Sequence, residues 1–309
     1  MLSIQARLFS RRLLRINPSF PARSSRSFAS FSMAALKDLR AKSGAPMMEC
    51  KKALQNTDGD LQAAMDWLRE HGAAKASSKV QGRETEEGLV GVVIAPDHKT
   101  ASLVKVAAET DFAGRSSKFV QLVLDIAEAA TNPDLPEGNI EKTLDVQPLL
   151  DEAIVAIREN LSVASAVKLV ASEENSILVG YVHNRLEGSN AGSAAAIVEV
   201  AGDVDMETLK STGKKLAMHV VAANPEYMTP DDVPEEEVNR EKEILANQIR
   251  DSGKPAEIVE KIVQGRMGKF YQQICLTEQA HMIEDSNPKV SKVLKQQGVT
   301  VKRFKSLTI

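Results

Sequence analysis

An acidic and an aromatic residue stand together where a strand-like pattern gives way to a helix-like one. Asp111 and Phe112 follow Thr110 at the end of an apolar stretch near 101–109. An exposed ring beside a carboxylate can enter an apolar pocket of another protein and bring a charge with it. A plainer interpretation is equally open from these residues alone. Asp111 would then cap the following helix, and Phe112 would pack on its own sheet.

The other reactive residues lack the spacings that catalysis or metal binding requires. The five histidines show no HxxH, HExxH or Cys–His spacing; they are His71, His98, His183, His219 and His281. Cys50 and Cys275 lie far apart and are expected to be reduced and buried. There is no Walker loop and no GxSxG motif, and Gly265 lies inside a helical pattern, where a dinucleotide loop cannot form. The sequence therefore predicts no enzyme activity, no metal and no cofactor.

The corner at Thr110 belongs to one of two similar stretches of the chain. The matching segments are 89–93 (LVGVV) with 178–182 (LVGYV), and 103–107 (LVKVA) with 197–201 (IVEVA). Both stretches continue through a helical pattern to an Asn-Pro pair. The second stretch has residues 203–206 (DVDM) in place of the acid and the aromatic. This duplication predicts a common framework in which one corner is specialised.

The elements expected around the repeats predict an α+β fold. Strands are expected near 88–95, 101–109, 164–171, 177–184 and 193–201, and helices near 115–130, 146–160 and 205–223. Short turns between successive strands predict small antiparallel sheets. Helices on one face of each sheet complete the layers. Residues 299–304 alternate apolar and polar side chains and are expected to return as a strand to the second sheet.

Two helical segments are expected outside this core. Residues 33–72 predict three short helices, the second of which begins with Met47 and Met48. Adjacent residues cannot both face one core, and flexible thioethers suit a partner's groove, although one or both side chains could belong to the core. Residues 235–270 predict an antiparallel helical hairpin that projects, with its turn at 252–255 (SGKP).

The first 32 residues differ in kind from the rest. They contain six arginines, eight serines and no acid, and their apolar residues can share one helical face. This pattern is typical of a transit peptide. A mitochondrial address is favoured over a plastid one because the arginine-studded apolar segment begins almost at Met1; a basic arm for nucleic acid is the alternative. Removal of six positive charges from a net charge of −3 leaves −9. An acidic mature protein disfavours direct nucleic-acid binding and favours a protein partner. No apolar run is long enough to span a membrane.

Four motifs resemble those of the elongation factor Ts family. They are residues 39–54 (LRAKSGAPMMECKKAL), residues 110–112 (TDF) after a strand, residues 217–220 (AMHV) running to Pro225, and residues 252–255 with 265–267 (GRM). The resemblance covers roughly residues 34–309 in order, and with the leader the chain is similar to mitochondrial members. One departure stands beside the second motif. The family commonly continues with a valine and a nearby lysine, whereas residues 113–115 read AGR here, which predicts a looser turn.

The resemblance implies a domain organisation. The expected parts are a mitochondrial transit peptide (1–32), a three-helix module similar to ubiquitin-associated domains (33–72), a linker (73–87), core subdomain N (88–175), core subdomain C (176–234 and 271–309) and the inserted hairpin (235–270). The two core subdomains correspond to the duplicated stretches.

The resemblance also implies an activity, which is guanine nucleotide exchange on the GTPase elongation factor Tu. Thr110, Asp111 and Phe112 would form a wedge that disturbs the magnesium and phosphate site of the GTPase. The N-terminal module would contact the partner through Leu39, Met47 and Met48, and subdomain C through His183. For His183 a solvent-exposed turn residue is an equal alternative. A Tu-binding or chaperone-like module without exchange activity is the alternative function. Whether the chain forms homo-oligomers, and whether the hairpin contacts Tu, stay open.

Overall fold

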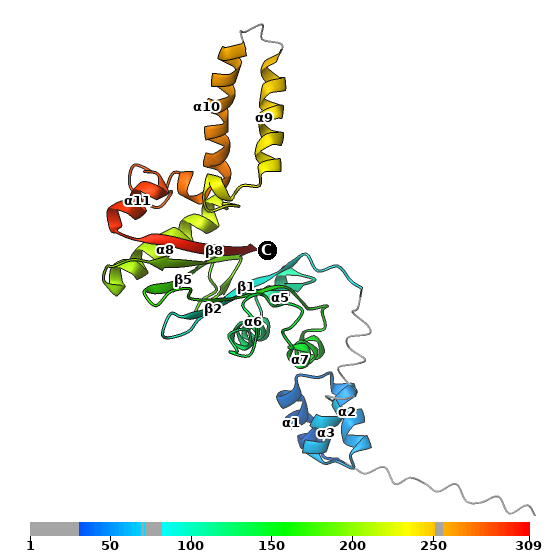
Figure 1. Cartoon of the computed structure of the whole chain (residues 1–309). Helices are drawn as coiled ribbons and strands as arrows, with labels where there is room; N and C mark the ends of the chain where they lie inside the picture. The colour runs from blue at the N-terminus through cyan, green and yellow to red at the C-terminus, as the bar shows by residue number, and fades with distance from the viewer. Residues whose placement is uncertain (1–30, 69–70, 72–81, 251–255) are drawn as a thin grey trace, which may run out of the picture.

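Two antiparallel sheets form the centre of the molecule (Figure 1). The computed structural model describes residues 31–68, 71, 82–250 and 256–309, so the predicted leader lies almost wholly outside the described residues. The five-stranded sheet has the order β3-β4-β2-β1-β6, and the three-stranded sheet has the order β5-β7-β8. The strands are β1 (Glu87–Ile94), β2 (Thr100–Ala108), β3 (Gly138–Asn139), β4 (Ser162–Val170), β5 (Ser176–His183), β6 (Ala191–Gly192), β7 (Ala194–Ala201) and β8 (Thr300–Thr308). The predicted antiparallel pairing and the return of the C-terminal strand to the second sheet are confirmed.

The two sheets pack face to face, and helices cover their outer faces. Side chains of a strand alternate between its two faces, so Val90 of β1 joins the core between the sheets while Leu89 joins the core under the helices. In β5, Leu178 and Ile177 divide in the same way. The helices of the core are α5 (Asp111–Gly114), α6 (Ser117–Ala129), α7 (Gln147–Ile157), α8 (Met206–Ala223) and α11 (Val290–Gln297). Helices α6 and α7 lie over the first sheet, and α8 and α11 over the second. The α+β class is therefore confirmed.

The two sheets share a strand order and an irregularity. Their central strands, β2 and β7, have their neighbours in matching order, β4-β2-β1 and β8-β7-β5. Pairing of β2 with β4 shifts register between Lys105 and Val106, and pairing of β7 with β8 shifts between Glu199 and Val200. These are matching positions of the sequence repeat. In each pair the extra residue lies on the partner strand, Ala164 of β4 and Lys302 of β8, so a β-bulge faces both central strands at the same point of the repeat.

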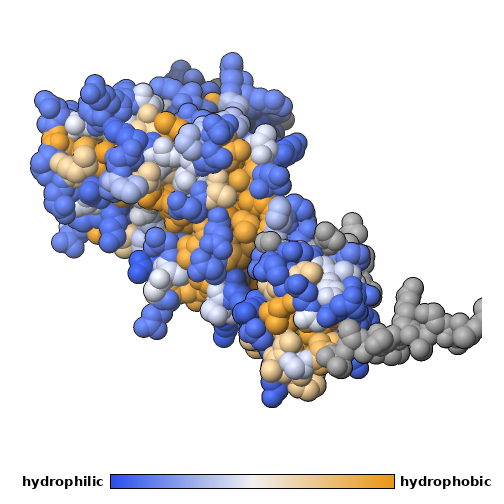
Figure 2. Space-filling view, turned by 90° about the horizontal axis from the view of Figure 1, so that it is seen from below, coloured by the Kyte–Doolittle hydropathy of each residue, from blue (hydrophilic) through white to orange (hydrophobic). Residues whose placement is uncertain are grey.

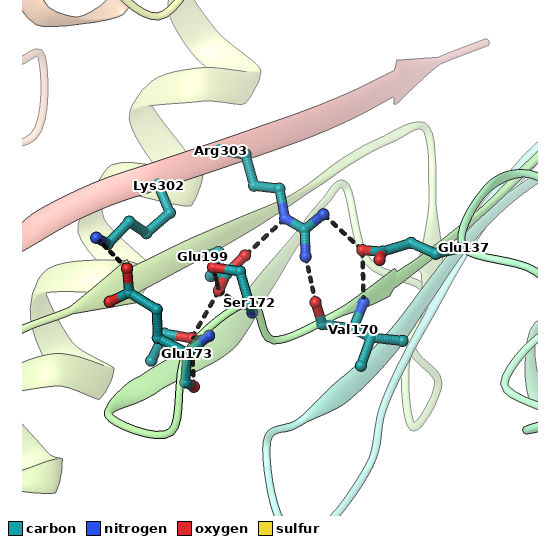
Figure 3. Close-up of polar contacts among 8 residues, drawn as sticks. Glu137, Val170, Ser172, Glu173, Glu199, Lys302 and Arg303 are labelled. Atoms are coloured by element: carbon teal, nitrogen blue, oxygen red, sulfur yellow. Dashed lines mark hydrogen bonds and ion pairs between the residues drawn. The ribbon is translucent and has the colours of Figure 1, made fainter.

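A polar network around Arg303 of β8 joins the sheets (Figure 3). The Arg303 guanidinium donates to the buried carboxylate of Glu199, at 2.6 Å, and to the carbonyl of Val170 in β4. Ser172 and Ser176 also donate to Glu199. Burial acts to raise the pKa of Glu199, but the hydrogen bonds from Ser176, Ser172 and Arg303 outweigh it and lower that pKa. Glu199 is therefore held as a carboxylate between the two sheets.

The N-terminal module consists of α1 (Met33–Ser43), α2 (Met47–Asn56) and α3 (Leu61–Trp67), as predicted. Asp60 caps α3 by accepting from the amide of Ala63, and Gly44 ends α1 in a left-handed conformation. Ser32 caps α1 in the same manner by accepting from the amide of Ala35. Val155 of α7 packs against the core of the module.

The predicted hairpin is formed by α9 (Glu235–Arg250) and α10 (Ala256–Ile274), which project away from the sheets (Figure 1). Leu245 and Met267 are buried, and Arg266 donates a hydrogen bond to Gln248 across the two helices at 3.0 Å. The predicted turn at 252–255 lies outside the described residues. Two 3-10 turns, Pro230–Asp232 and Leu276–Glu278, lie at the base of the hairpin.

Candidate functional site

The corner after β2 presents an aromatic side chain to solvent. Thr110 caps the single turn of α5, with its side-chain oxygen 3.4 Å from the amide nitrogen of Ala113. Phe112 is 78% exposed, the largest exposed fraction among the large hydrophobic side chains of the described part of the chain. The plainer interpretation is wrong on both counts, because Thr110 rather than Asp111 provides the cap and Phe112 does not pack on its own sheet. The corner leaves about 1.5–3 kcal/mol of apolar transfer free energy available to a partner.

Asp111 lies beside the ring and is also exposed. Its carboxylate forms an ion pair with Arg115 at 3.2 Å, and both side chains are largely in solvent. An exposed pair of this kind contributes little to stability, so Asp111 can exchange Arg115 for another charged group at little cost.

The turn itself is regular. The looser turn expected from residues 113–115 is not found, because Asp111–Gly114 form one α-helical turn. Ala113 and Gly114 are buried. A second capped helix, α6, starts directly after it, with Ser116 accepting from the amide of Phe119. The exposed ring therefore stands on a buried and capped backbone.

Two glutamates that sequence reasoning missed contact this corner. Glu159, which follows α7, accepts hydrogen bonds from the Thr110 amide at 3.0 Å and from the Thr110 hydroxyl at 2.7 Å. Glu109 accepts from the amide of Asn160 at 2.7 Å. Neither glutamate belongs to a recognisable motif, and the two contacting segments lie about fifty residues apart in the chain. Sequence patterning offered no signal for them.

The N-terminal module exposes two of its three candidate residues. Met47 is 44% exposed and Met48 is 62% exposed, so both thioethers are accessible on α2. Leu39 is fully buried in the core of the module, together with Cys50 and other apolar side chains. The expectation that Leu39 contacts a partner is corrected accordingly: its side chain packs inside the module, where it supports the helices that carry the methionines.

A hollow lies between the module and α7. Figure 2, seen from below, shows apolar surface where the N-terminal module meets the rest of the molecule. A groove of about 450 Å³ is lined there by Ala45, Met65 and Leu68 of the module and by Pro148 and Val155 of α7. The module thus rests on the core beside an open apolar groove.

His183 ends β5 and is exposed. Its Nδ1 atom lies 3.2 Å from the hydroxyl of Tyr181, and its backbone carbonyl accepts from the amide of Ser193. The imidazole is therefore accessible at the edge of the second sheet. Among the described residues, no hydrogen bond, ion pair or ring contact joins Phe112, Met48 and His183, which lie on three different elements.

His219 is a core residue of α8. It is fully buried, its Nδ1 atom accepts from the Met282 amide at 3.2 Å, and its Nε2 atom lies 3.0 Å from the side-chain oxygen of Gln279. Burial and the neighbouring His281 lower the pKa of His219 to about 4. The ring is therefore neutral near pH 7 and serves as a structural hydrogen-bonding group.

The described residues contain no group of three or more histidine, cysteine or acidic side chains that could hold a metal ion. Cys50 and Cys275 are free and buried. In the same part of the chain, no helix is long and apolar enough to cross a membrane. Among the residues that the sequence singles out, Asp111, Phe112, Met47, Met48 and His183 are exposed in the structure.

Comparison with known proteins places the chain among translation proteins. A family model described as elongation factor TS matches residues 109–309. Elongation factor Ts of Rhodospirillum centenum is 40% identical over 283 residues, which cover 88% of this chain and 89% of that protein. Elongation factor Ts of Halothermothrix orenii is 36% identical over 283 residues, which cover 88% and 90%. Elongation factor Ts of Bartonella tribocorum is 40% identical over 262 residues, which cover 82% and 83%. On these matches, this chain belongs to the elongation factor Ts family.

Proposed function

We propose that this protein is a guanine nucleotide exchange factor for elongation factor Tu, with no covalent chemistry of its own. The observation that carries the proposal is the exposure of Phe112 on a capped turn, at the position of the family motif Thr110–Phe112. An aromatic side chain left in solvent offers its stabilisation to a partner, not to its own fold. Membership of the elongation factor Ts family supports the identity of that partner.

Exchange requires differential affinity and no bond making. A GTPase holds GDP through backbone amides, a lysine and a magnesium ion that bridges phosphate and protein oxygens. A factor that binds the empty GTPase more tightly than the GDP-loaded one lowers the affinity of the GTPase for GDP. By linkage, GDP lowers the affinity for the factor by the same ratio. Reversal of a 1:99 distribution requires about 5.5 kcal/mol of differential affinity. A single phenylalanine supplies about half of that at most, so the rest must come from a broad interface.

In this proposal Phe112 enters an apolar gap of the GTPase domain near the magnesium site. Asp111 leaves its exposed ion pair with Arg115 and disturbs the charges around the metal. A carboxylate close to the phosphates would repel them and compete with their oxygens for the metal ion. Buried Ala113 and Gly114 keep the backbone of the turn against the first sheet while this happens.

Met47, Met48 and His183 would supply the surrounding interface. The methionines would fill a groove of the GTPase domain, and His183 would contact a later domain of the same partner. Their positions on α2 and β5 favour a partner that spans much of the molecule, with roughly 2,000 Å² or more of total buried area. The net charge, which falls from −3 to −9 without the leader, favours a protein over nucleic acid at this interface.

The organellar setting is part of the same proposal. The arginine-rich and serine-rich residues 1–32 would direct the protein to the mitochondrial matrix, and the two sheets with matching bulges would be duplicated subdomains of one core. A fluorescent protein fused to residues 1–32 should accumulate in mitochondria. Accumulation in plastids or in the cytosol would contradict this part of the proposal.

Release of labelled GDP from elongation factor Tu tests the activity. Wild-type protein should accelerate the release, and Phe112→Ala should lower the acceleration by about 10-fold or more, equivalent to about 1.4 kcal/mol of lost differential affinity. Met206→Ala is the matched control, because Met206 is another exposed apolar side chain at the start of a helix in the second unit. Equal acceleration by wild type and Phe112→Ala would remove the wedge role. Tight binding to Tu with unchanged GDP release would instead favour the module without exchange activity.

A further inference from the structure

The corner that carries Phe112 is held by two carboxylates that cross the same gap in opposite directions. From the end of β2, Glu109 reaches out and accepts from the amide of Asn160. From the other side, Glu159 reaches back and accepts from both the amide and the hydroxyl of Thr110. Each glutamate is thus bound to the residue that follows the other glutamate in the chain. This reciprocal pair is called the carboxylate clamp below.

The clamp determines how Thr110 caps α5. The Thr110 hydroxyl has one hydrogen, and a carboxylate can only accept, so the hydroxyl donates to Glu159. Its oxygen lone pairs are then free to accept from the amide of Ala113. Both the backbone amide and the hydroxyl of Thr110 are thus held by hydrogen bonds. These bonds fix the orientation of the helical turn that carries Phe112. Hydrogen bonds to an ionised acceptor are strong and directional, which apolar packing is not.

The first sheet with its helices is called the first unit below, and the second sheet with its helices the second unit. At the matching position, the second unit has an apolar contact in place of the charged one. When Leu103 is aligned with Ile197, Thr110 matches Val204. Helix α7 ends at the left-handed Arg158 and is followed by Glu159, while α11 ends at the left-handed Gly298 and is followed by Val299. Val204 and Val299 belong to one apolar cluster. The second unit therefore joins these two segments by an apolar contact. The first unit, which carries Phe112, joins them by hydrogen bonds to a carboxylate.

The clamp is also tied to the segment that enters the core from the N-terminal side. Arg83 pairs with Glu109 at 3.4 Å, and the backbone carbonyl of Arg83 accepts from the side-chain amide of Asn160. The chain that leads toward β1 is thereby attached to Glu109 and Asn160, two of the four residues that hold the corner.

We infer that Glu159 and Glu109 are positioning residues for nucleotide exchange, which hold the Thr110–Phe112 corner in the orientation that a GTPase must meet. The inference rests on the proposed function. Phe112 makes no packing contact that would orient its own turn, since most of its side chain is in solvent. The orientation must come from the backbone below it, and the only charged side chain among the described residues that hydrogen-bonds to the Thr110 backbone is Glu159. Once the clamp is removed, the ring stays available but is no longer held in one place.

Glu159→Gln tests the inference, because it keeps the shape of the side chain and removes its charge. GDP release from elongation factor Tu is measured over a range of factor concentrations. The maximum release rate should fall by about 10-fold, while the half-saturating concentration, set mainly by the broad interface, should change by less than about 3-fold. Thr110→Val copies the second unit at this point and should lower the maximum rate in the same way but by less. Glu128→Gln, an exposed charge change on α6, is the matched control and should leave both quantities unchanged.

Two further readouts separate positioning from general damage. Hydrogen exchange of the Ala113 and Arg115 amides in the free protein should accelerate in Glu159→Gln, while amides of β7 should keep their protection. In a Phe112→Ala background, Glu159→Gln should cause no further loss of rate, because a positioning residue acts through the ring that it orients.

The outcomes distinguish this inference from the function on which it rests. A wild-type protein that does not accelerate GDP release overturns the proposed function. An active wild type with Glu159→Gln at the wild-type rate overturns the positioning role alone. A Glu159→Gln loss that is equally large with and without Phe112 overturns it as well. If Glu159→Gln unfolds at a much lower temperature, Thr110→Val and the amide exchange decide the question, and unchanged values in both contradict the inference.

Discussion

The two corners of the core share a framework and differ in how their first helical turn is held. At the second corner, Asp205 caps α8, which continues without a break from Met206 to Ala223. At the first corner, α5 ends after one turn and a new cap at Ser116 begins α6. In the register of the repeat, Phe112 matches Met206, and Arg115 matches Leu209. Both corners expose an apolar side chain, but only the first separates it from the long helix that follows.

The difference has a local cause. Leu209 is buried and holds the first turn of α8 to its sheet, whereas Arg115 is exposed and holds nothing apolar. The first corner compensates with buried Ala113 and with the carboxylate clamp around Thr110. The continuous helix α8 anchors the second corner through its own buried side chains. The break between α5 and α6 leaves Phe112 on a separate helical turn that is held by hydrogen bonds. Each prediction below compares a change or a response in one unit with one in the other.

The largest effect is expected where charge is buried between the sheets. Arg303→Ala removes the cation that pairs with the fully buried Glu199 and should cost about 3–5 kcal/mol of unfolding free energy. Lys105 of the first unit matches Glu199, not Arg303, in the repeat; it is partly exposed and donates to the Thr308 carbonyl. Lys105→Ala should therefore cost less than about 1 kcal/mol. Urea unfolding of both variants checks the contrast, and equal costs would contradict it.

Acid should loosen the second unit before the first. The pKa of His219 is lowered to about 4 in the folded protein, against 6.5 for an ordinary histidine, so the unfolded chain binds more protons between these values. Stability contributed by neutral His219 is fully present above pH 6.5 and is lost as the pH falls toward 4, up to about 3 kcal/mol.

Hydrogen exchange at pH 7.5 and 4.5 measures this effect. Amides of α8 and of the segment around Met282 should lose protection at low pH, while those of α6, which packs on the first sheet, should lose less. A uniform loss over both units would show that another group controls the acid response.

A glycine substitution should distinguish the two junctions at a smaller scale. A Cβ atom on Gly202 would lie 2.5 Å from the carbonyl oxygen of Gly298, so Gly202→Ala forces two backbones apart and should cost about 1–3 kcal/mol. A Cβ atom on Gly114 would lie 3.6 Å from the Gly88 carbonyl oxygen, which is an ordinary contact. Gly114→Ala should change stability by less than about 0.5 kcal/mol. Thermal unfolding of the pair decides, and a costly Gly114→Ala would mean that the first corner is packed more tightly than its geometry indicates.

The smallest effect on stability is expected at the exposed apolar side chains themselves. Phe112→Ala and Met206→Ala should each change the unfolding free energy by less than about 0.5 kcal/mol, because both side chains are largely in solvent. Only Phe112→Ala should slow GDP release. Calorimetry beside the release assay checks both statements, and a destabilised Phe112→Ala would assign the ring to the fold rather than to a partner.

Much of the fold was predictable because strands and helices follow from the local periodicity of apolar residues. The repeat of 89–93 in 178–182 identifies two matching first strands, and both are found in antiparallel pairs. The three short helices of residues 33–72 and the helical hairpin of residues 235–270 also follow from local signals, and both are found. The corner at Thr110–Phe112 was predictable as a candidate for the same reason, since a strand pattern, an acid and an aromatic lie within a few residues of one another.

The sequence by itself thus determined which segments form strands and helices and which corner is unusual. Only the tertiary structure decided that Phe112 faces solvent, that Leu39 is enclosed by its own module, and that Glu159 reaches Thr110 from a distant segment. Periodicity reports which face of an element is apolar, but it does not report what that face meets. Contacts between segments far apart in the chain depend on how the layers pack, and packing is a property of all the elements together.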